Sequence, residues 1–362
     1  MFSNKELRSM IITLFFEQLL VMLVGIVDTF VVSSCGEAAV SGVSLVNQFN
    51  TIFIYLFTAL AIYNAGAALY RSMAKTKVTM YISFAANIIN VVGNIIGVYV
   101  LKAGVAGVAY PSLISRVFSA IIITVLCFNK KLEAYYDSKD IFRFDGKMLK
   151  RILNIAIPNG VENGIFQLVK VALSSIVAMF GTYQIAANGV AQSIWSLAAL
   201  VGSAMGPVFI TVIGQCMGAK DVDQAKFYFS KLIKWSLVFS IVWNVLVLAI
   251  TPFILQFYNL ADETKHLIII LVIIHNIANT VVFPLSGPLS QGLRATGDVK
   301  FTMIVSIAST VGGRLVLSII LALGLHLGVI GIALAMCGDW TIRAIIFYYR
   351  YKSNAWTKFE VI

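Results

Sequence analysis

The sequence predicts an all-α polytopic membrane protein made of two pseudo-symmetric helical lobes, with about ten transmembrane helices. Three observations carry this prediction: the composition, a series of long apolar segments, and an internal repeat. Hydrophobic residues make up 59% of the 362 residues, charged residues make up only 12%, and the mean hydropathy is +0.90. Soluble domains carry about 25% charged residues. Because so few charges cannot form a hydrophilic surface, lipid must cover most of the exterior.

Ten apolar segments are long enough to cross a bilayer, whose hydrocarbon core of about 30 Å takes roughly 20 helical residues. They are residues 10–33, 38–70, 78–100, 105–128, 155–180, 185–213, 232–257, 265–292, 301–323 and 329–349. Basic residues gather in the segments after every second span, which the positive-inside rule assigns to the cytoplasm. We therefore expect both termini to be cytoplasmic. The net charge of +11 then reflects topology and anionic headgroups rather than binding to nucleic acid.

The longest basic segment, residues 129–151, is the predicted cytoplasmic linker between the lobes. It separates an N-terminal transmembrane lobe, residues 1–128, from a C-terminal lobe, residues 152–352, and residues 353–362 form a cytoplasmic tail. The chain begins with a basic segment and an apolar run, as a signal peptide does. However, the run contains two acids and no A-x-A cleavage site, so we expect it to be retained as the first helix.

The sequence offers no motif for enzyme chemistry or for a bound metal cofactor. The four cysteines form no CxxC pair and lie far from the three histidines, so neither a zinc site nor a disulfide framework is expected. No nucleophile–base pair and no phosphate-binding loop is evident. We therefore expect a protein that is not an enzyme and has no cofactor.

The chain repeats itself at two offsets. An offset of 145 residues places Glu17 on Glu162, and an offset of 223 residues places Arg71 on Arg294. One further residue of offset places GVAGVA (104–109) on GVIGIA (328–333). Such ordered recurrence indicates a duplicated bundle. Because each repeat begins on the cytoplasmic side, we expect parallel repeats with a substrate cleft between the lobes near the midplane.

The two offsets differ by 223 − 145 = 78 residues, so the second half contains a block that the first half lacks. This block covers about residues 207–284, which corresponds to two helices. We therefore expect four helices in the first lobe and six in the second. The junction lies near residues 58–66. Two explanations of this deficit are open: natural loss of the segment, or an error in the assembly or annotation of the gene.

Two acids in the first span, Glu17 and Asp28, are candidates for cation coupling. A charge at the bilayer centre costs about 2.5–3.5 kcal/mol on insertion scales, so each acid needs a favourable environment. Eleven residues are close to three helical turns, which places both acids on one face. Asp28 could gain and lose a proton, or could ligate Na⁺ together with amide oxygens. The alternative is that both acids lie at the membrane interface.

Three asparagines form a polar stripe on an otherwise apolar helix. Asn87, Asn90 and Asn94 follow i, i+3, i+7 spacing and could complete a cation site with Asp28. The alternative is interhelical hydrogen bonding, which stabilises by about 0.6 kcal/mol per bond. In the repeat partner of this helix, Arg314 places a cation where the first lobe has amides.

Four segments resemble the multidrug and toxic compound extrusion (MATE) family of secondary transporters. They are VDTFVVSSCGEAAVSGVSLV (27–46), IPNGVENGIFQLVK (157–170), AANGVAQSI (186–194) and GLRATGDVK (292–300). The resemblance implies twelve helices in two six-helix lobes, and efflux of cationic amphiphilic compounds driven by inward Na⁺ or H⁺. It also implies that Asp28 is the coupling acid of the first helix. The chain departs from the family in lacking most of what would be helices three and four.

The predicted substrate cleft would be lined by polar side chains of both lobes. The candidates are Glu162, Gln167, Lys170, Asn47, Asn50, Asn188 and Gln192. Family members often carry a membrane glutamate one turn deeper than Glu162, where this chain has Phe166 beside Gln167. Lys170 is either an internal counter-charge to an acid or a residue that faces the aqueous cleft.

The leading interpretation is a monomeric, cation-coupled drug exporter in the inner or plasma membrane of a bacterium, surrounded by lipid. A lipid-linked oligosaccharide flippase of the same superfamily is one alternative, and it would require a strongly cationic cavity. Acids and amides dominate the candidate face, which favours drug export. The 78-residue deficit motivates a second alternative, a transport-inactive remnant.

Overall fold

The structure, a computed structural model, describes residues 2–33, 59–104, 106–137, 145–256 and 261–359, with residues 24–33 described by their backbone. Within these ranges the chain is helical and contains no β-strand. Eight of the described helices are long and apolar enough to cross a membrane. The all-α polytopic class is therefore confirmed, whereas the count of ten spans stays a prediction.

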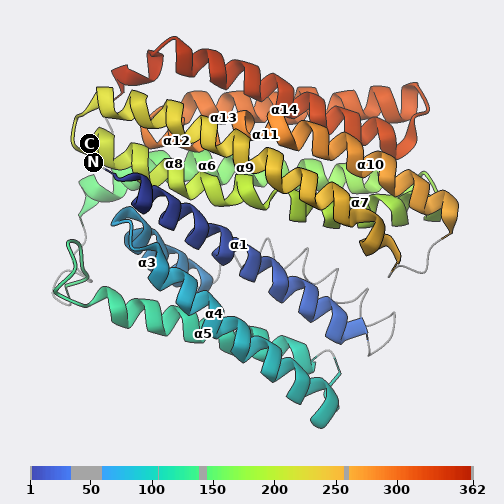
Figure 1. The fold of residues 1–362 in the computed structure, drawn as a ribbon, viewed down its shortest axis with the longest axis horizontal. Coiled ribbons are helices and arrows are strands. Elements are labelled where there is room, and N and C mark those ends of the chain that lie inside the picture. Colours follow the sequence, from blue (N-terminus) through green and yellow to red (C-terminus); the bar gives the residue numbers. More distant parts are fainter. Residues whose placement is uncertain (1, 34–58, 105, 138–144, 257–260, 360–362) are drawn as a thin grey trace. The chain divides into compact units, whose positions relative to one another are not determined.

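Residues Phe2–Phe144 form the first structural unit and residues Asp145–Ile362 form the second. The first unit, drawn from blue to blue-green in Figure 1, contains α1 (Asn4–Ser33), α3 (Ala59–Ser72), α4 (Thr76–Ile95), a short π-helix η1 (Ile96–Val100) and α5 (Ala106–Cys127). Helix α4 packs against α1 and α5, and α3 packs against α5. Tyr70, Ile82, Ile123 and Cys127 form the core of this unit.

Helix α1 starts at a capping box. The Ser3 hydroxyl accepts a hydrogen bond from the Glu6 amide at 3.1 Å, and the Glu6 carboxylate accepts one from the Ser3 amide at 2.7 Å. These bonds lower the pKa of Glu6 below its ordinary value. Two backbone N–H groups at the start of the helix, those of Ser3 and Glu6, therefore have hydrogen-bond partners before the predicted membrane span begins.

The second unit contains longer and more interrupted helices. They are α6 (Gly146–Ala178), α7 (Thr182–Ala198), α8 (Leu200–Gly218), α9 (Val222–Gln256), α10 (Asp262–Val281), α11 (Phe283–Ser286), α12 (Pro288–Ala295), α13 (Val299–Ala308), the π-helices η2 (Ser309–Val316) and η3 (Ile319–Gly324), α14 (Gly328–Lys352) and the 3₁₀-helix η4 (Ala355–Lys358). Its core lies where α6, α7, α9, α10 and α14 meet, and includes Leu173, Ala187, Val247, Ile268 and Val329.

Two predicted spans are broken in the structure. The span 185–213 divides at Ala199 into α7 and α8, and the span 265–292 divides at Val282 and Gly287 into α10, α11 and α12. Pro284 and Pro288 stand in the first turns of α11 and α12, where a residue without an N–H is tolerated. Helix α7 packs against α10, and α8 packs against α12, so the two broken helices lie side by side.

Helix α6 begins earlier than predicted. The Asp145 side chain accepts hydrogen bonds from the amides of Lys147 and Met148 at 2.8 and 3.2 Å, which caps the helix at Gly146. The end of the predicted linker 129–151 is therefore helical. The sequence signal was present in the Asp145-Gly146 pair, a capping side chain placed directly before the run.

The backbone confirms the predicted duplication. Lys102 and Gly104, before α5, have φ angles of 51° and 55°. His326, before α14, and Gly328, its first residue, both have φ of 55°. These four residues occupy matching positions in two turns of the same shape. Within the described residues, no helix of the first unit corresponds to α9, and the count of four helices against six stays a prediction.

Candidate functional site

Glu17 of α1 is bound by side chains of two neighbouring helices. Its carboxylate is 2% exposed, pairs with the guanidinium of Arg71 on α3, and accepts a hydrogen bond from Thr79 Oγ1 on α4 at 2.8 Å. A buried ion pair of this kind is costly to break, since the buried Glu17 carboxylate would lose its counter-charge. Glu17 thus joins three helices of the first unit, and its predicted coupling role has to be weighed against this contact.

Glu162 of α6 binds the corresponding arginine in the second unit. It accepts a hydrogen bond from Arg294 Nη2 at 2.6 Å, and Arg294 Nη1 donates to Asn159 Oδ1 at 2.8 Å. The predicted repeat placed Glu17 on Glu162 and Arg71 on Arg294. The structure confirms both correspondences, because each glutamate binds the arginine of its own unit. We call these two arrangements the Glu–Arg clamps.

The asparagine stripe of α4 makes hydrogen bonds between helices. Asn87 Nδ2 donates to the Leu20 carbonyl of α1 at 3.0 Å, and Asn90 Nδ2 donates to Ser112 Oγ of α5 at 2.9 Å. Asn94 Nδ2 donates to Asn90 Oδ1 at 3.2 Å. This is the geometry of the interhelical alternative. Asp28 belongs to the part of α1 that is described by its backbone alone. Its predicted cation site with these amides therefore stays a prediction.

The second unit contains a cavity of about 330 Å³ between α6, α7, η2 and α14, which we call the second-unit cavity. Three of the predicted cleft residues line it together: Lys170, Asn188 and Gln192. The other described candidates, Glu162 and Gln167, do not line it. Asn47 and Asn50 lie outside the described residues.

The remaining walls are mostly apolar or hydroxylic. They are Phe166, Leu173, Ser174, Val177, Ser193, Trp195, Ser196, Ile332 and Met336, with Arg314 as a second cation. The guanidinium carbon of Arg314 lies 5.0 Å from the centroid of the Phe166 ring, within range of a cation–π contact. Phe166 is the position, one turn after Glu162, at which the resemblance stated above implied a glutamate. The lining described here contains two cations and no carboxylate.

Arg314 belongs to a buried ionic network. Asp339 of α14 is fully buried, and its Oδ2 lies 2.7 Å from Arg314 Nη2 and 2.6 Å from Arg343 Nη2. Ser309 Oγ donates to Asp339 Oδ1. One carboxylate is therefore shared by two guanidinium groups, which leaves the network with an excess positive charge beside the cavity.

Sequence reasoning did not find Asp339, Arg343 or the pair of Asp298 and Arg350. Arg350 Nε of α14 lies 2.7 Å from Asp298 Oδ2, and Asp298 is 2% exposed. A signal existed for Asp339 and Arg343, which are an acid and a base four residues apart in an apolar run. The other partners lie more than 20 residues apart in sequence, and only helix packing brings them together.

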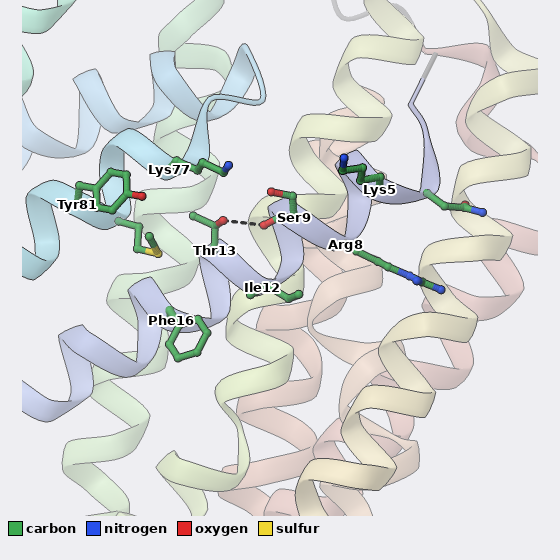
Figure 2. A pocket seen from close by; sticks show the side chains of 10 residues that line it. Lys5, Arg8, Ser9, Ile12, Thr13, Phe16, Lys77 and Tyr81 are labelled. Atoms are coloured by element: carbon green, nitrogen blue, oxygen red, sulfur yellow. Dashed lines mark hydrogen bonds between the residues drawn. The ribbon is translucent and has the colours of Figure 1, made fainter.

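A second cavity, of about 710 Å³, lies at the start of α1 in the first unit (Figure 2). Lys5 and Arg8 of α1 and Lys77 of α4 line it, together with the rings of Phe16 and Tyr81. Thr13 Oγ1 donates to the Ser9 carbonyl at 2.6 Å on the same helix. None of these residues was predicted as a site residue. The three basic side chains lie in segments that the charge pattern assigns to the cytoplasm.

Comparison with known proteins gives consistent results. The MatE family model matches residues 14–62 and again residues 158–320. The chain is 27% identical over 300 residues to the uncharacterized transporter YisQ of Bacillus subtilis, covering 80% of this chain and 64% of that relative. It is 25% identical over 285 residues to the probable multidrug resistance protein NorM of Bacillus cereus, covering 75% and 58%. The chain thus spans less than two thirds of either relative.

The fold is that of solved MATE transporters. An outward-facing multidrug resistance MATE family transporter of the MOP superfamily superimposes with a TM-score of 0.86 at 16% identity, over 98% of this chain and 96% of that one. The first match of the family model is short and the second is long, and the deficit in the first lobe stays a prediction. Because the family model covers more than half of the chain, this protein is a member of the MatE family, the MATE transporters.

Proposed function

We propose that this protein is a secondary active transporter that exports amphiphilic small molecules by antiport with Na⁺ or H⁺. The observation that carries this proposal is that two glutamates of its membrane helices are paired with arginines. Glu17 and Glu162 are bound to arginines, so neither is free to exchange a cation without breaking a buried pair. Asp28 is then the acid of α1 on which coupling depends.

Further parts of the proposal follow from charge and from family membership. The positive-inside pattern supports cytoplasmic termini in a bacterial cell membrane. The relative NorM is named as a multidrug resistance protein, which supports cationic amphiphilic drugs as substrates here. We expect the protein to act as a monomer, since its repeats supply both lobes of a transporter.

One observation favours the second candidate function, a lipid-linked oligosaccharide flippase. That function requires a cationic cavity, and Lys170 and Arg314 give the second-unit cavity this character. The two candidates differ in the charge of the molecule that is moved. A drug exporter moves a cationic dye, whereas a flippase moves an anionic lipid-linked head group.

The coupling proposal is tested in proteoliposomes with an imposed Na⁺ or pH gradient. Wild-type protein should move ethidium against the dye gradient, and Asp28→Asn should abolish this movement. Asp223→Asn, at the exposed start of α9, is the matched control and should leave it unchanged. Equal transport by Asp28→Asn and wild type would refute the coupling role. Absence of transport by wild-type protein under both gradients would favour the transport-inactive remnant.

A further inference from the structure

We propose that the second-unit cavity binds the anionic head of an amphiphile, a carboxylate, sulfonate or phosphate, and that a one-residue insertion in the helix carrying Arg314 built this site. The inference rests on the proposed function in one respect, namely that the protein handles amphiphiles. It differs from the expected preference for cations, and it concerns the second unit alone.

The two repeats are in register at the start of α4 and α13. Thr79 Oγ1 donates to the Thr76 carbonyl at 2.9 Å, and Thr302 Oγ1 donates to the Val299 carbonyl at 2.8 Å. In both pairs the residues of the second unit are 223 positions later. The turn before each helix keeps the same offset, since the amides of Lys75 and Asp298 donate to residues 70 and 293.

The offset is one residue larger at the other end of these helices. The Leu101 amide donates to the Ile96 carbonyl at 2.9 Å, and the Leu325 amide donates to the Ile320 carbonyl at 2.9 Å. These pairs are 224 positions apart. The second repeat therefore has one additional residue between Thr302 and Ile320.

A π-helix accommodates this additional residue. In the first unit the segment Thr76–Ile95 is a continuous α-helix, whereas the second unit has η2 over Ser309–Val316 in the corresponding place. A π-helical turn closes its hydrogen bonds over five residues instead of four, so it absorbs one insertion without breaking the helix, and such turns are frequent at functional sites. The later π-helices η1 and η3 correspond to each other and do not account for the difference.

The insertion changes which side chain stands at the packed face. At the larger offset of 224 residues, Asn90 corresponds to Arg314, and both side chains are buried. The same offset makes Ser115 correspond to Asp339. Asn90 makes a neutral hydrogen bond to α5, whereas Arg314 makes an ion pair with α14 and also lines the cavity. Because Asp339 is shared with Arg343, Arg314 keeps charge that Asp339 does not fully neutralise.

The rest of the cavity fits an anionic amphiphile. Lys170 lines it from α6 and makes no ion pair within the described part of the chain, while Asn188 and Gln192 supply amide donors. Trp195 Nε1 and Arg314 Nε, both on lining side chains, are buried donors that lack a hydrogen-bond partner among the described residues, so an added acceptor would satisfy them. Apolar side chains, among them Leu173, Val177 and Ile332, would hold the hydrocarbon part.

A cationic ligand would meet the opposite situation. It would approach two positive side chains without a lining carboxylate to offset them, and like charges in a low dielectric repel strongly. Guanidinium and ammonium groups instead form charge-assisted hydrogen bonds with carboxylate, sulfonate and phosphate oxygens. The preference between two probes that differ only in the sign of the head group therefore tests the inference.

The experiment uses the purified full chain in nanodiscs of phosphatidylcholine without any ion gradient. The probes are 11-bromoundecanoate and 11-bromoundecyltrimethylammonium, whose bromine quenches tryptophan fluorescence at short range. We expect saturable quenching by the anionic probe alone, and reduced quenching in Trp195→Phe. Lys170→Gln should lower the affinity for the anionic probe about tenfold, as the loss of one charge-assisted hydrogen bond predicts. Lys170→Glu should reverse the preference between the probes.

Lys150→Glu, on the exposed part of the same helix, is the matched control and should behave as wild type. Equal affinity for both probes, unchanged binding in both Lys170 variants, or unchanged quenching in Trp195→Phe would each overturn the inference. Nanodiscs with brominated phosphatidylglycerol identify a lipid headgroup as the ligand if they quench Trp195 where brominated phosphatidylcholine does not. A free solute is identified if the soluble anionic probe quenches and both brominated lipids do not.

This binding test is separate from the transport test. Loss of ethidium export together with retained anion binding would refute the proposed function and keep the present inference. Retained export without preference for the anionic probe would refute the present inference alone.

Discussion

The first and second units share their Glu–Arg clamps but differ in the helix that follows. In both units a glutamate of the first helix binds an arginine at the end of a later helix. Beyond that point, α4 presents amides that make neutral hydrogen bonds, while η2 presents Arg314 to a shared carboxylate. The comparison indicates that the Glu–Arg clamps are a shared part of the duplicated scaffold, whereas the helix that follows carries neutral amides in one unit and a charged guanidinium in the other.

The largest effect is expected from breaking the ionic network of the second unit. Asp339→Asn removes the carboxylate that binds both Arg314 and Arg343, and leaves a buried and a half-buried guanidinium without that counter-charge. We expect a loss of about 3–5 kcal/mol of unfolding free energy. Thermal unfolding in detergent, followed by size-exclusion chromatography, measures it.

The matched change in the first unit is Ser115→Ala, at the position that corresponds to Asp339. Its hydroxyl donates to the Ser112 carbonyl of its own helix at 3.0 Å and, among the described residues, not to another helix, so we expect a change within about 0.5 kcal/mol in the free energy of unfolding. Equal effects of the two variants would contradict the proposed difference between the units.

The next effect comes from the clamps themselves. Glu17→Gln and Glu162→Gln should each lower the free energy of unfolding by about 2–4 kcal/mol, because each removes the carboxylate charge that pairs with a partly buried arginine. The loss should be greater for Glu17, which is 2% exposed, than for Glu162, which is 17% exposed.

A charge exchange distinguishes a clamp from a coupling site. Glu17→Arg combined with Arg71→Glu should recover part of the stability that either single change removes, as a double-mutant cycle would show. Glu17→Gln with wild-type stability but without coupled transport would instead support the coupling role predicted from sequence.

Sequence reasoning predicted the class, the repeat and the acids, and stopped at contacts between distant helices. The offsets already placed Glu17 on Glu162 and Arg71 on Arg294. They did not show that these residues bind each other, because the two correspondences occur at different offsets. The one-residue change of offset between Ser306 and Gly328 was visible as well, yet a π-helix has no pattern of its own in an apolar sequence.

Helix breaks were predictable only where proline marks them. Pro284 and Pro288 signal the division of the span 265–292. The division at Ala199 has no such residue beside it, and it lies where a tertiary contact is tight: a Cβ on Gly202 would overlap the ring of Phe283. Packing between two helices thus sets a boundary that neither helix encodes by itself.

A smaller effect is expected where the repeats share a close helix contact. A Cβ built on Gly331 of α14 would lie 2.7 Å from the Ala322 backbone nitrogen, and the corresponding Gly107 approaches Gly97 in the first unit. Gly331→Ala should therefore cost about 1–3 kcal/mol, since backbone atoms cannot move aside as a side chain can. Gly164→Ala on α6 has open space around its Cβ and serves as the control in the same thermal unfolding assay.

The smallest effect, and the one that separates the two interpretations of the asparagine stripe, is that of Asn87→Ala. If Asn87 only joins α4 to the Leu20 carbonyl of α1, the variant should lose about 0.6 kcal/mol, the average value of an interhelical hydrogen bond in a membrane. Transport would then keep its dependence on the Na⁺ or H⁺ gradient. If Asn87 instead completes a cation site with Asp28, the concentration of Na⁺ or H⁺ needed for half-maximal transport should rise. The free energy of unfolding should then still fall by no more than about 0.6 kcal/mol. Asn129→Ala, in the exposed turn after α5, provides the reference for an amide removed outside the helical bundle.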